Sequence, residues 1–160
     1  MSFFEDIVVG ESVMIGRHVF TAEDIKAFAN RFDPQLFHID ETAAAASHFG
    51  ALCASGWHTA IMWMRLMTDY QRRSDEAALA RGERVGQVGP STGFRDLKWL
   101  KPVYVGDTID YRVEVMETRA SNSRPGFGLM SLLATGTNQK GELVISFVST
   151  TFVERRGKAS

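Results

Sequence analysis

The chain has 160 residues and a formal net charge of −1, which favours one domain with a substantial core and does not suggest nucleic acid or an anionic membrane as the main partner. Its N-terminal sequence lacks the basic start and apolar run of a signal peptide, and its longest apolar stretch, AIMWM, is too short to span a bilayer. The one cysteine, Cys53, cannot form an internal disulfide, so we expect a reducing, cytoplasmic setting. A single domain over residues 1–160 is expected, with a flexible tail from about residue 154.

The first expected elements are a strand at residues 10–20 and a helix at 21–32. Thr21 is a typical N-cap for this helix. The apolar positions recur with helical spacing at Ile25, Phe28, Ala29 and Phe32. The helix is expected to end before Pro34, because the residue that precedes a proline avoids the helical conformation. Asp33 is thus placed at the C-terminal end of the helix.

Two helices are expected further along the chain. The first is short and lies within residues 41–49, where Asp40 is a typical N-cap. The second runs from Gly56 to Tyr70 and is apolar on almost every side, at Trp57, Ala60, Ile61, Met62, Trp63, Met64, Leu66 and Met67. A helix of this kind is buried on most of its surface. Residues 72–90 are expected to form a loop with some helical character.

The C-terminal half changes to the period of β-strands. Residues 108–118 are expected to form a strand, because apolar Ile109, Tyr111, Val113 and Val115 alternate with polar side chains, which is typical of a half-buried strand. Three more strands are expected, at residues 91–103, 127–137 and 142–153. Helices followed by consecutive antiparallel strands predict an α+β domain, in which one long helix packs against a curved antiparallel sheet.

Two motifs stand out, DPQLFH at residues 33–38 and FGALCASGWHTA at 49–60. Followed by FRDLKWLKPVYVGDTI and three strands, they resemble the MaoC-like family of hot-dog-fold acyl-CoA dehydratases and (R)-specific enoyl-CoA hydratases. In that family the first motif reads Asp-x-Asn-Pro-x-His, and Asp33 and His38 match its acid and its histidine. Gln35 replaces the asparagine, the proline precedes the amide, and the glycine that usually precedes the aspartate is absent.

The resemblance implies a hot-dog fold, a long central helix wrapped by a curved antiparallel sheet, and the reversible addition of water to a 2-enoyl thioester. This reaction needs a bound water that is deprotonated, a proton delivered to the α-carbon, and stabilisation of the thioester oxygen. Asp33 and His38 are expected to hold the water as an acid/base pair. The backbone N–H of Gly56, at the start of the long helix, is expected to stabilise the oxygen. Three neighbours are expected to contact the substrate: Gln35, Ser55 and Trp57.

Each of these residues also has a structural explanation. Asp33 can be a turn former before a proline, His38 a structural histidine, and Gly56 a glycine that begins a helix. Ser55 can be the N-cap of that helix, and Gln35 can orient His38 or the loop. The aspartate and histidine at the family's spacing, together with the glycine that begins the helix, favour the catalytic interpretation.

No metal site is expected, because the histidines lack the spacing of zinc ligands, at His38, His48 and His58. No cofactor is expected beyond coenzyme A as part of the substrate. Three basic residues either contact coenzyme A phosphates or form a solvated strand face: Arg95, Lys98 and Lys101. Four bulky side chains are expected to favour a short or compact acyl group: Trp57, Met62, Trp63 and Met64.

Two other functions use the same fold. An acyl-CoA thioesterase would have a carboxylate on or near the central helix, but residues 56–68 contain none and Asp69 comes late. A non-catalytic acyl-CoA-binding protein would not need the Asp33 and His38 pair. The sequence therefore favours an acyl-CoA hydratase/dehydratase. The resemblance also implies a homodimer or a higher homo-oligomer, because hot-dog proteins of this kind pair their sheets in a dimer.

Overall fold

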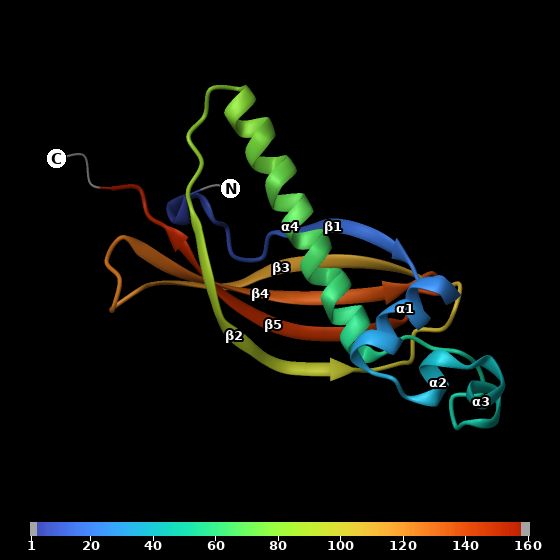
Figure 1. Cartoon of the computed structure of the whole chain (residues 1–160). Helices are drawn as coiled ribbons and strands as arrows, with labels where there is room; N and C mark the ends of the chain where they lie inside the picture. Colours follow the sequence, from blue (N-terminus) through green and yellow to red (C-terminus); the bar gives the residue numbers. More distant parts are fainter. Residues whose placement is uncertain (1–2, 158–160) are drawn as a thin grey trace.

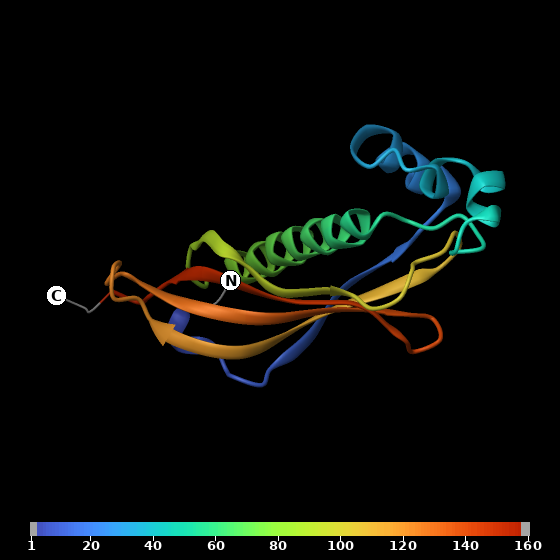
Figure 2. The same ribbon diagram turned by 90° about the horizontal axis from the view of Figure 1, so that it is seen from below.

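The computed structural model describes residues 3–157, which form a five-stranded sheet, a long helix against one face of it, and short helices at one end (Figure 1). The strands are β1 (Ser12–Val19), β2 (Val88–Trp99), β3 (Thr108–Ala120), β4 (Phe127–Asn138) and β5 (Leu143–Glu154). Their order is β1-β3-β4-β5-β2, and all neighbours are antiparallel. Figure 2 shows the curvature of the sheet beneath the helix. The predicted α+β architecture is confirmed.

The helices are η1 (Phe4–Asp6), α1 (Ala22–Phe32), α2 (Leu36–Ile39), α3 (Glu41–Ala46) and α4 (Gly56–Ala80). Thr21 Oγ1 accepts a hydrogen bond from the backbone N–H of Asp24 at 3.1 Å, which confirms the predicted N-cap of α1. Helix α2 was not predicted, since its four residues are too few to show a period. It nevertheless positions part of the site described below.

Helix α4 continues to Ala80, whereas the sequence predicted an end at Tyr70 and a loop beyond it. The added turns are polar, and ion pairs one turn apart stabilise them, as between Arg72 and Glu76 at 3.1 Å. Gly82, with a φ of 77°, provides the left-handed residue that ends the helix. The apolar pattern therefore marked only the part of the helix that packs against the sheet.

The core lies between α4 and the sheet. The alternating residues of β3 are buried, as the strand pattern predicted: Ile109, Tyr111, Val113 and Val115. The Tyr111 hydroxyl donates a hydrogen bond to the backbone carbonyl of Thr59 at 2.9 Å, which ties β3 to α4. Burial of each side chain of this size contributes about 1.5–3 kcal/mol.

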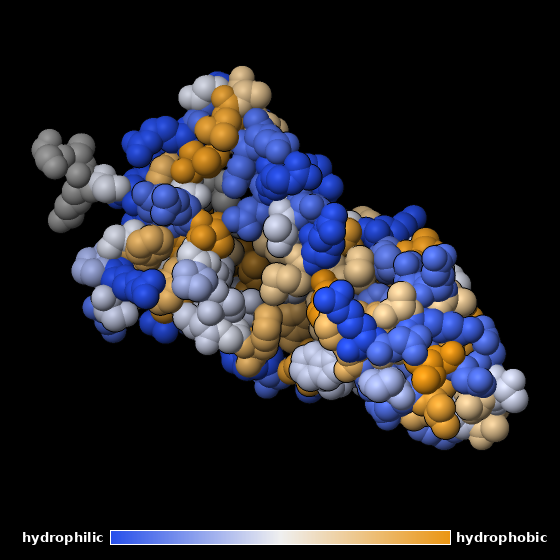
Figure 3. Space-filling view, in the orientation of Figure 1, coloured by the Kyte–Doolittle hydropathy of each residue, from blue (hydrophilic) through white to orange (hydrophobic). Residues whose placement is uncertain are grey.

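Helix α4 is buried on fewer sides than its sequence predicted. Trp63 is 4% exposed, but Trp57, Ile61 and Met64 are 56%, 50% and 44% exposed. One sheet covers one face of a helix, so the apolar residues on another face stay exposed in a single chain. Strand β2, at the edge of the sheet, adds Phe94 at 54% exposure. Figure 3 shows apolar side chains in the hollow between α4 and β2; these exposed residues are called the α4–β2 surface below.

Two predicted boundaries are corrected. Strand β2 begins at Val88 and ends at Trp99, because its backbone pairs with β5 between these residues, instead of covering 91–103. Glu154 is the last residue of β5, and the next two residues form ion pairs with the N-terminal segment at 3.2 and 2.8 Å, so no tail begins at 154. Residues 158–160 of the predicted tail lie outside the described residues. Each helix within residues 3–157 is too short or too polar to span a lipid bilayer.

Candidate active site

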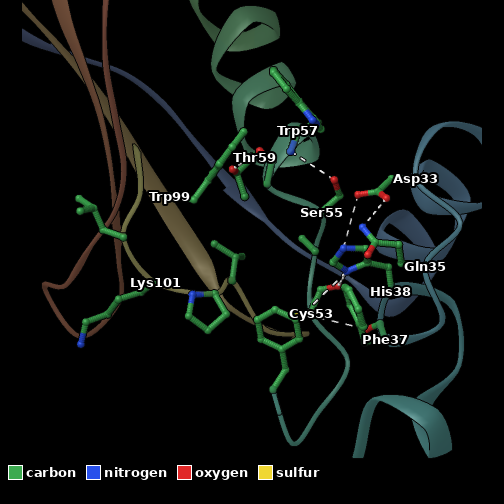
Figure 4. A pocket seen from close by; sticks show the side chains of 16 residues that line it. Asp33, Gln35, Phe37, His38, Cys53, Ser55, Trp57, Thr59, Trp99 and Lys101 are labelled. Carbon is green, nitrogen blue, oxygen red and sulfur yellow. Dashed lines mark hydrogen bonds and ion pairs between the residues drawn. The ribbon is translucent and has the colours of Figure 1, made fainter. Parts of the chain in front are cut away.

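A cavity of about 440 Å³ opens beside the N-terminal end of α4 (Figure 4). Its walls come from the end of α1, from α2, from the segment that leads into α4, and from the end of β2 with the residues after it. All six site residues predicted from the sequence line this cavity: Asp33, Gln35, His38, Ser55, Gly56 and Trp57. The fold thus brings the two motifs together, and the catalytic roles stay predictions.

Asp33 and His38 are positioned by consecutive short elements. Asp33 is the C-cap of α1, and its backbone N–H donates to the carbonyl of Ala29 at 2.9 Å. Pro34 prevents continuation of the helix. Gln35 is the N-cap of α2, and its carbonyl accepts the backbone N–H of His38 at 2.9 Å. This turn directs the His38 side chain, which is 6% exposed, back towards Asp33.

The two nitrogens of His38 have different partners. Nδ1 lies 2.7 Å from the backbone carbonyl oxygen of Cys53. A carbonyl oxygen only accepts, so Nδ1 carries a proton. Nε2 lies 3.5 Å from Asp33 Oδ2, and in the neutral imidazole both of these atoms are acceptors. Two acceptors that face one another in this way can share a proton, or both accept from a single water molecule.

Gln35 holds the carboxylate of Asp33 through Oδ1, the oxygen that does not face His38. The side-chain amide of Gln35 donates to Oδ1 at 2.8 Å, which leaves Oδ2 for His38. Partial burial raises the pKa of Asp33, but hydrogen bonds from Ser55 and Gln35 and the nearby His38 outweigh it, so the pKa lies below its ordinary value of 3.8. Asp33 is therefore ionised at neutral pH. Gln35, predicted to contact substrate or to orient His38, is placed to orient Asp33.

Ser55 and Gly56 form the start of α4. Ser55 is 1% exposed, and its Oγ accepts the backbone N–H of Trp57 at 3.2 Å, so it is the N-cap. The amide of Gly56 lies in the first turn, where a helix has no internal acceptor, and no described residue accepts its hydrogen. A Cβ at this position would lie 2.6 Å from the Trp99 indole. Glycine is therefore required for Trp99 to lie against the helix start.

Trp99 is a cavity residue that the sequence did not single out. It is the last residue of β2, and its ring meets Trp57 edge to face, with centroids 5.1 Å apart. A lone tryptophan within the predicted strand 91–103 gives no sign of its partner. Of the three basic residues considered for coenzyme A, only Lys101 lines the cavity; its amine forms an ion pair with Glu142 at 2.5 Å.

The other histidines lie outside this cavity. His48 lies against Phe49, with ring centroids 3.8 Å apart. His58 is buried and stacked on Phe28 of α1, with centroids 4.6 Å apart and an interplanar angle of 4°. This stacking packs α1 against the start of α4. Within residues 3–157, no group of three or more histidine, cysteine, aspartate or glutamate side chains is arranged to hold a metal ion.

Acid is expected to weaken the stacking of His58 on Phe28. Burial, and to a smaller extent His18, lowers the pKa of His58 to about 4, against a small opposing effect of Asp24. The folded state favours neutral His58, so its contribution to stability is complete above the unfolded pKa of 6.5 and is lost as the pH falls towards 4. Between about pH 7.5 and pH 5 the free energy of unfolding should fall by roughly 2 kcal/mol through this group.

Urea unfolding of wild-type protein and His58→Phe at the two pH values measures this effect. His58→Phe can stack on Phe28 without titrating. Between about pH 7.5 and pH 5 it should therefore lose about 2 kcal/mol less of its free energy of unfolding than wild type does. His48→Phe, at an exposed position, should keep the wild-type response. Equal acid sensitivity of His58→Phe and wild type would show that His58 does not carry the effect.

Comparison with known proteins decides the family. The model of the MaoC like domain matches residues 9–129. This chain belongs to the MaoC-like dehydratase family. A MaoC-like dehydratase from Rhodospirillum rubrum is 37% identical, with 97% of this chain and 98% of that one covered and a TM-score of 0.79. A Mycobacterium tuberculosis protein described as a double hot-dog fold shares 20% identity over 99% of this chain and 46% of its own length, with a TM-score of 0.71, a likeness of fold alone.

Among relatives with an assigned reaction, the mesaconyl-CoA hydratase of Cereibacter sphaeroides is 35% identical over 68 residues. These residues are 42% of this chain and 20% of that enzyme. The MaoC-like domain described here therefore has the predicted hot-dog fold and the predicted family. The local match to one hydratase covers too little of that enzyme to transfer its substrate.

Proposed function

We propose that this MaoC-like protein is an acyl-CoA hydratase/dehydratase that adds water reversibly to a 2-enoyl thioester. One observation carries the proposal. Asp33 Oδ2 and His38 Nε2 lie 3.5 Å apart in a cavity that Gly56, the first residue of α4, also lines. A paired proton acceptor and a backbone donor in one cavity are the two kinds of group that the reaction requires.

Asp33 and His38 act on one water in this mechanism. Both accept hydrogen bonds from it, so the water is oriented with its oxygen towards the β-carbon of the substrate. As the oxygen bonds to that carbon, one proton of the water passes to the pair, and the pair delivers this proton to the α-carbon, so that both residues return to their starting state. The negative charge that develops on the thioester oxygen is stabilised by the Gly56 N–H and by the N-terminus of α4. Dehydration follows the same steps in reverse.

Coenzyme A enters only as part of the substrate. The thioesterase alternative is less well supported, because Asp69 on α4 forms an ion pair with Arg65 at 2.8 Å and does not line the cavity. Among the described residues that line the cavity, Asp33 is the one carboxylate. It lies beside a histidine that is suited to share a water.

Hydration of a panel of trans-2-enoyl-CoAs tests the proposal, with loss of the conjugated thioester absorbance as the readout. We expect higher kcat/KM for a four-carbon than for a twelve-carbon substrate, because Trp57 and Trp99 narrow the cavity. Met62, Trp63 and Met64, also expected to shorten the site, do not line this cavity. A preference for the twelve-carbon substrate would contradict the expected specificity, and no hydration across the panel would contradict the activity.

Assembly is the second part of the proposal. The α4–β2 surface is apolar and exposed, and it borders the free edge of β2. We propose that a second copy covers it and that the protein is a homodimer or a larger homo-oligomer. In sedimentation at micromolar concentration, wild type should be at least a dimer. Phe94→Glu should raise the dissociation constant at least about tenfold, because it buries an unpaired charge. A stable wild-type monomer would refute the assembly.

A further inference from the structure

A second cavity of about 160 Å³ lies beside the candidate active site, between α4 and β2. Its lining is almost wholly apolar and includes Ala60, Ile61 and Met64 from α4, Phe94 and Leu97 from β2, and Phe147 from β5. The two cavities share one lining residue, Trp57. The apolar cavity therefore adjoins the one that contains Asp33 and His38.

Two tryptophans stand at the junction of these cavities. Trp57 lines both, and Trp99, two residues after Leu97 on β2, lines the active-site cavity. Their rings meet at an interplanar angle of 76°, and the Trp99 indole lies against Gly56. Figure 4 shows both side chains beside the start of α4, with Trp99 on the side away from Asp33 and His38.

We propose that Trp99, together with Trp57, forms a wall that sets the upper limit of acyl length. This inference rests on the proposed function, because it takes the occupant of the active-site cavity to be an acyl-CoA. With the reacting carbons between His38 and Gly56, the polar groups of the cavity contact the thioester end of the acyl group. A linear acyl chain that continues along α4 meets the two indoles, and behind them lies a space lined by hydrocarbon. The second copy proposed above would close this space from solvent at the α4–β2 surface.

The wall is assigned to Trp99 in particular because of how the ring is placed. Glycine at 56 is what allows the indole to approach the helix start, where the thioester oxygen is expected to lie. Trp99 is 45% exposed, so its removal leaves the core residues of α4 and the sheet in place. Truncation at Trp99 should therefore connect the two cavities without removing a group that takes part in proton transfer.

Binding of two unreactive thioethers, S-butyl-CoA and S-octyl-CoA, tests the wall by calorimetry. In wild type the octyl compound should bind no more tightly than the butyl compound. In Trp99→Ala the ratio of the two affinities should shift towards the octyl compound by at least about 15-fold, since each methylene that leaves water strengthens binding roughly fourfold and at least two of the added methylenes should enter the apolar cavity. Hydration of trans-2-octenoyl-CoA relative to crotonyl-CoA should rise in the same variant.

Two control variants show whether a change in the affinity ratio comes from removal of the Trp99 indole or from looser packing in general. Met64→Ala enlarges the apolar cavity but keeps both indoles, so its affinity ratio should equal that of wild type. Adding Ala60→Leu to Trp99→Ala fills the space behind the wall and should cancel the gain. If Trp99→Ala does not give a cooperative melt, Trp99→Val replaces it in each arm.

If a folded Trp99 variant binds S-butyl-CoA but its ratio of octyl to butyl affinity equals that of wild type, the proposed role of Trp99 is wrong and the proposed activity is unaffected. Wild type that binds both probes but hydrates no enoyl-CoA would overturn the activity, and the ratio would still decide the wall. Wild type that binds neither probe would overturn both.

Discussion

Asp33→Asn and His38→Asn are each expected to lower kcat for hydration by about 10²–10⁴-fold, and the double variant by little more than the worse single. The reason is that Asp33 Oδ2 and His38 Nε2, 3.5 Å apart, are proposed to act on one water. Once either acceptor is lost, the other no longer has a correctly oriented water to act on. Hydration and dehydration must fall together, because a catalyst does not change the equilibrium. Steady-state kinetics of the two singles and the double in both directions measure this.

The controls follow from the surroundings of each residue. In Asp33→Asn the side-chain oxygen can still accept from Gln35, so the loop should keep its conformation. His38 is buried and bonded to the Cys53 carbonyl, so His38→Asn is expected to cost about 1–3 kcal/mol of stability, and its kinetics are measured below its melting range. His48→Asn, on the exposed side of the same region, should retain full activity. Losses that multiply in the double variant would mean that the residues act independently.

Gly56→Pro is expected to lower kcat by about 10²–10³-fold relative to Gly56→Ala, because proline removes the backbone N–H proposed to stabilise the thioester oxygen. Both changes add a Cβ that would lie 2.6 Å from the Trp99 indole, so both are made in the Trp99→Ala background. Proline is favoured in the first turn of a helix. The preceding Ser55, at φ −56° and ψ 140°, already has a conformation that proline permits.

The alanine variant is the matched control for this comparison. It keeps the amide hydrogen and adds a side chain at the same place, so any steric effect is shared. The two variants should have melting temperatures within a few degrees of each other. Equal kcat for the proline and alanine variants would show that the Gly56 amide does not stabilise the transition state.

The parts of the fold that the sequence predicted depend on local patterns. The alternation at Ile109, Tyr111, Val113 and Val115 indicated the strand β3, and these four apolar positions are buried. Thr21 and Pro34 marked the two ends of α1, because capping and the restriction before proline act on neighbouring residues. The two site motifs were found from the sequence for a similar reason, since each lies within a short segment.

The parts that the sequence did not predict depend on contacts between distant segments. Trp99 meets Gly56 and Trp57 only after β2 has paired with β5. His38 meets the backbone carbonyl of Cys53 because the four-residue helix α2 turns the chain, and so short a helix shows no period. Burial around α4 was overestimated because the apolar pattern does not say whether the sheet or a second copy covers each face.

Mass spectrometry of the products formed from crotonyl-CoA in heavy-oxygen water tests the central claim most directly. The proposed reaction predicts an intact 3-hydroxybutyryl-CoA with one heavy oxygen on its β-carbon, formed by wild type and reduced at least about 100-fold in Asp33→Asn. Release of free coenzyme A with heavy oxygen in the carboxylate of the acid would instead identify a thioesterase. Unchanged crotonyl-CoA under conditions in which the protein binds S-butyl-CoA would contradict catalysis altogether.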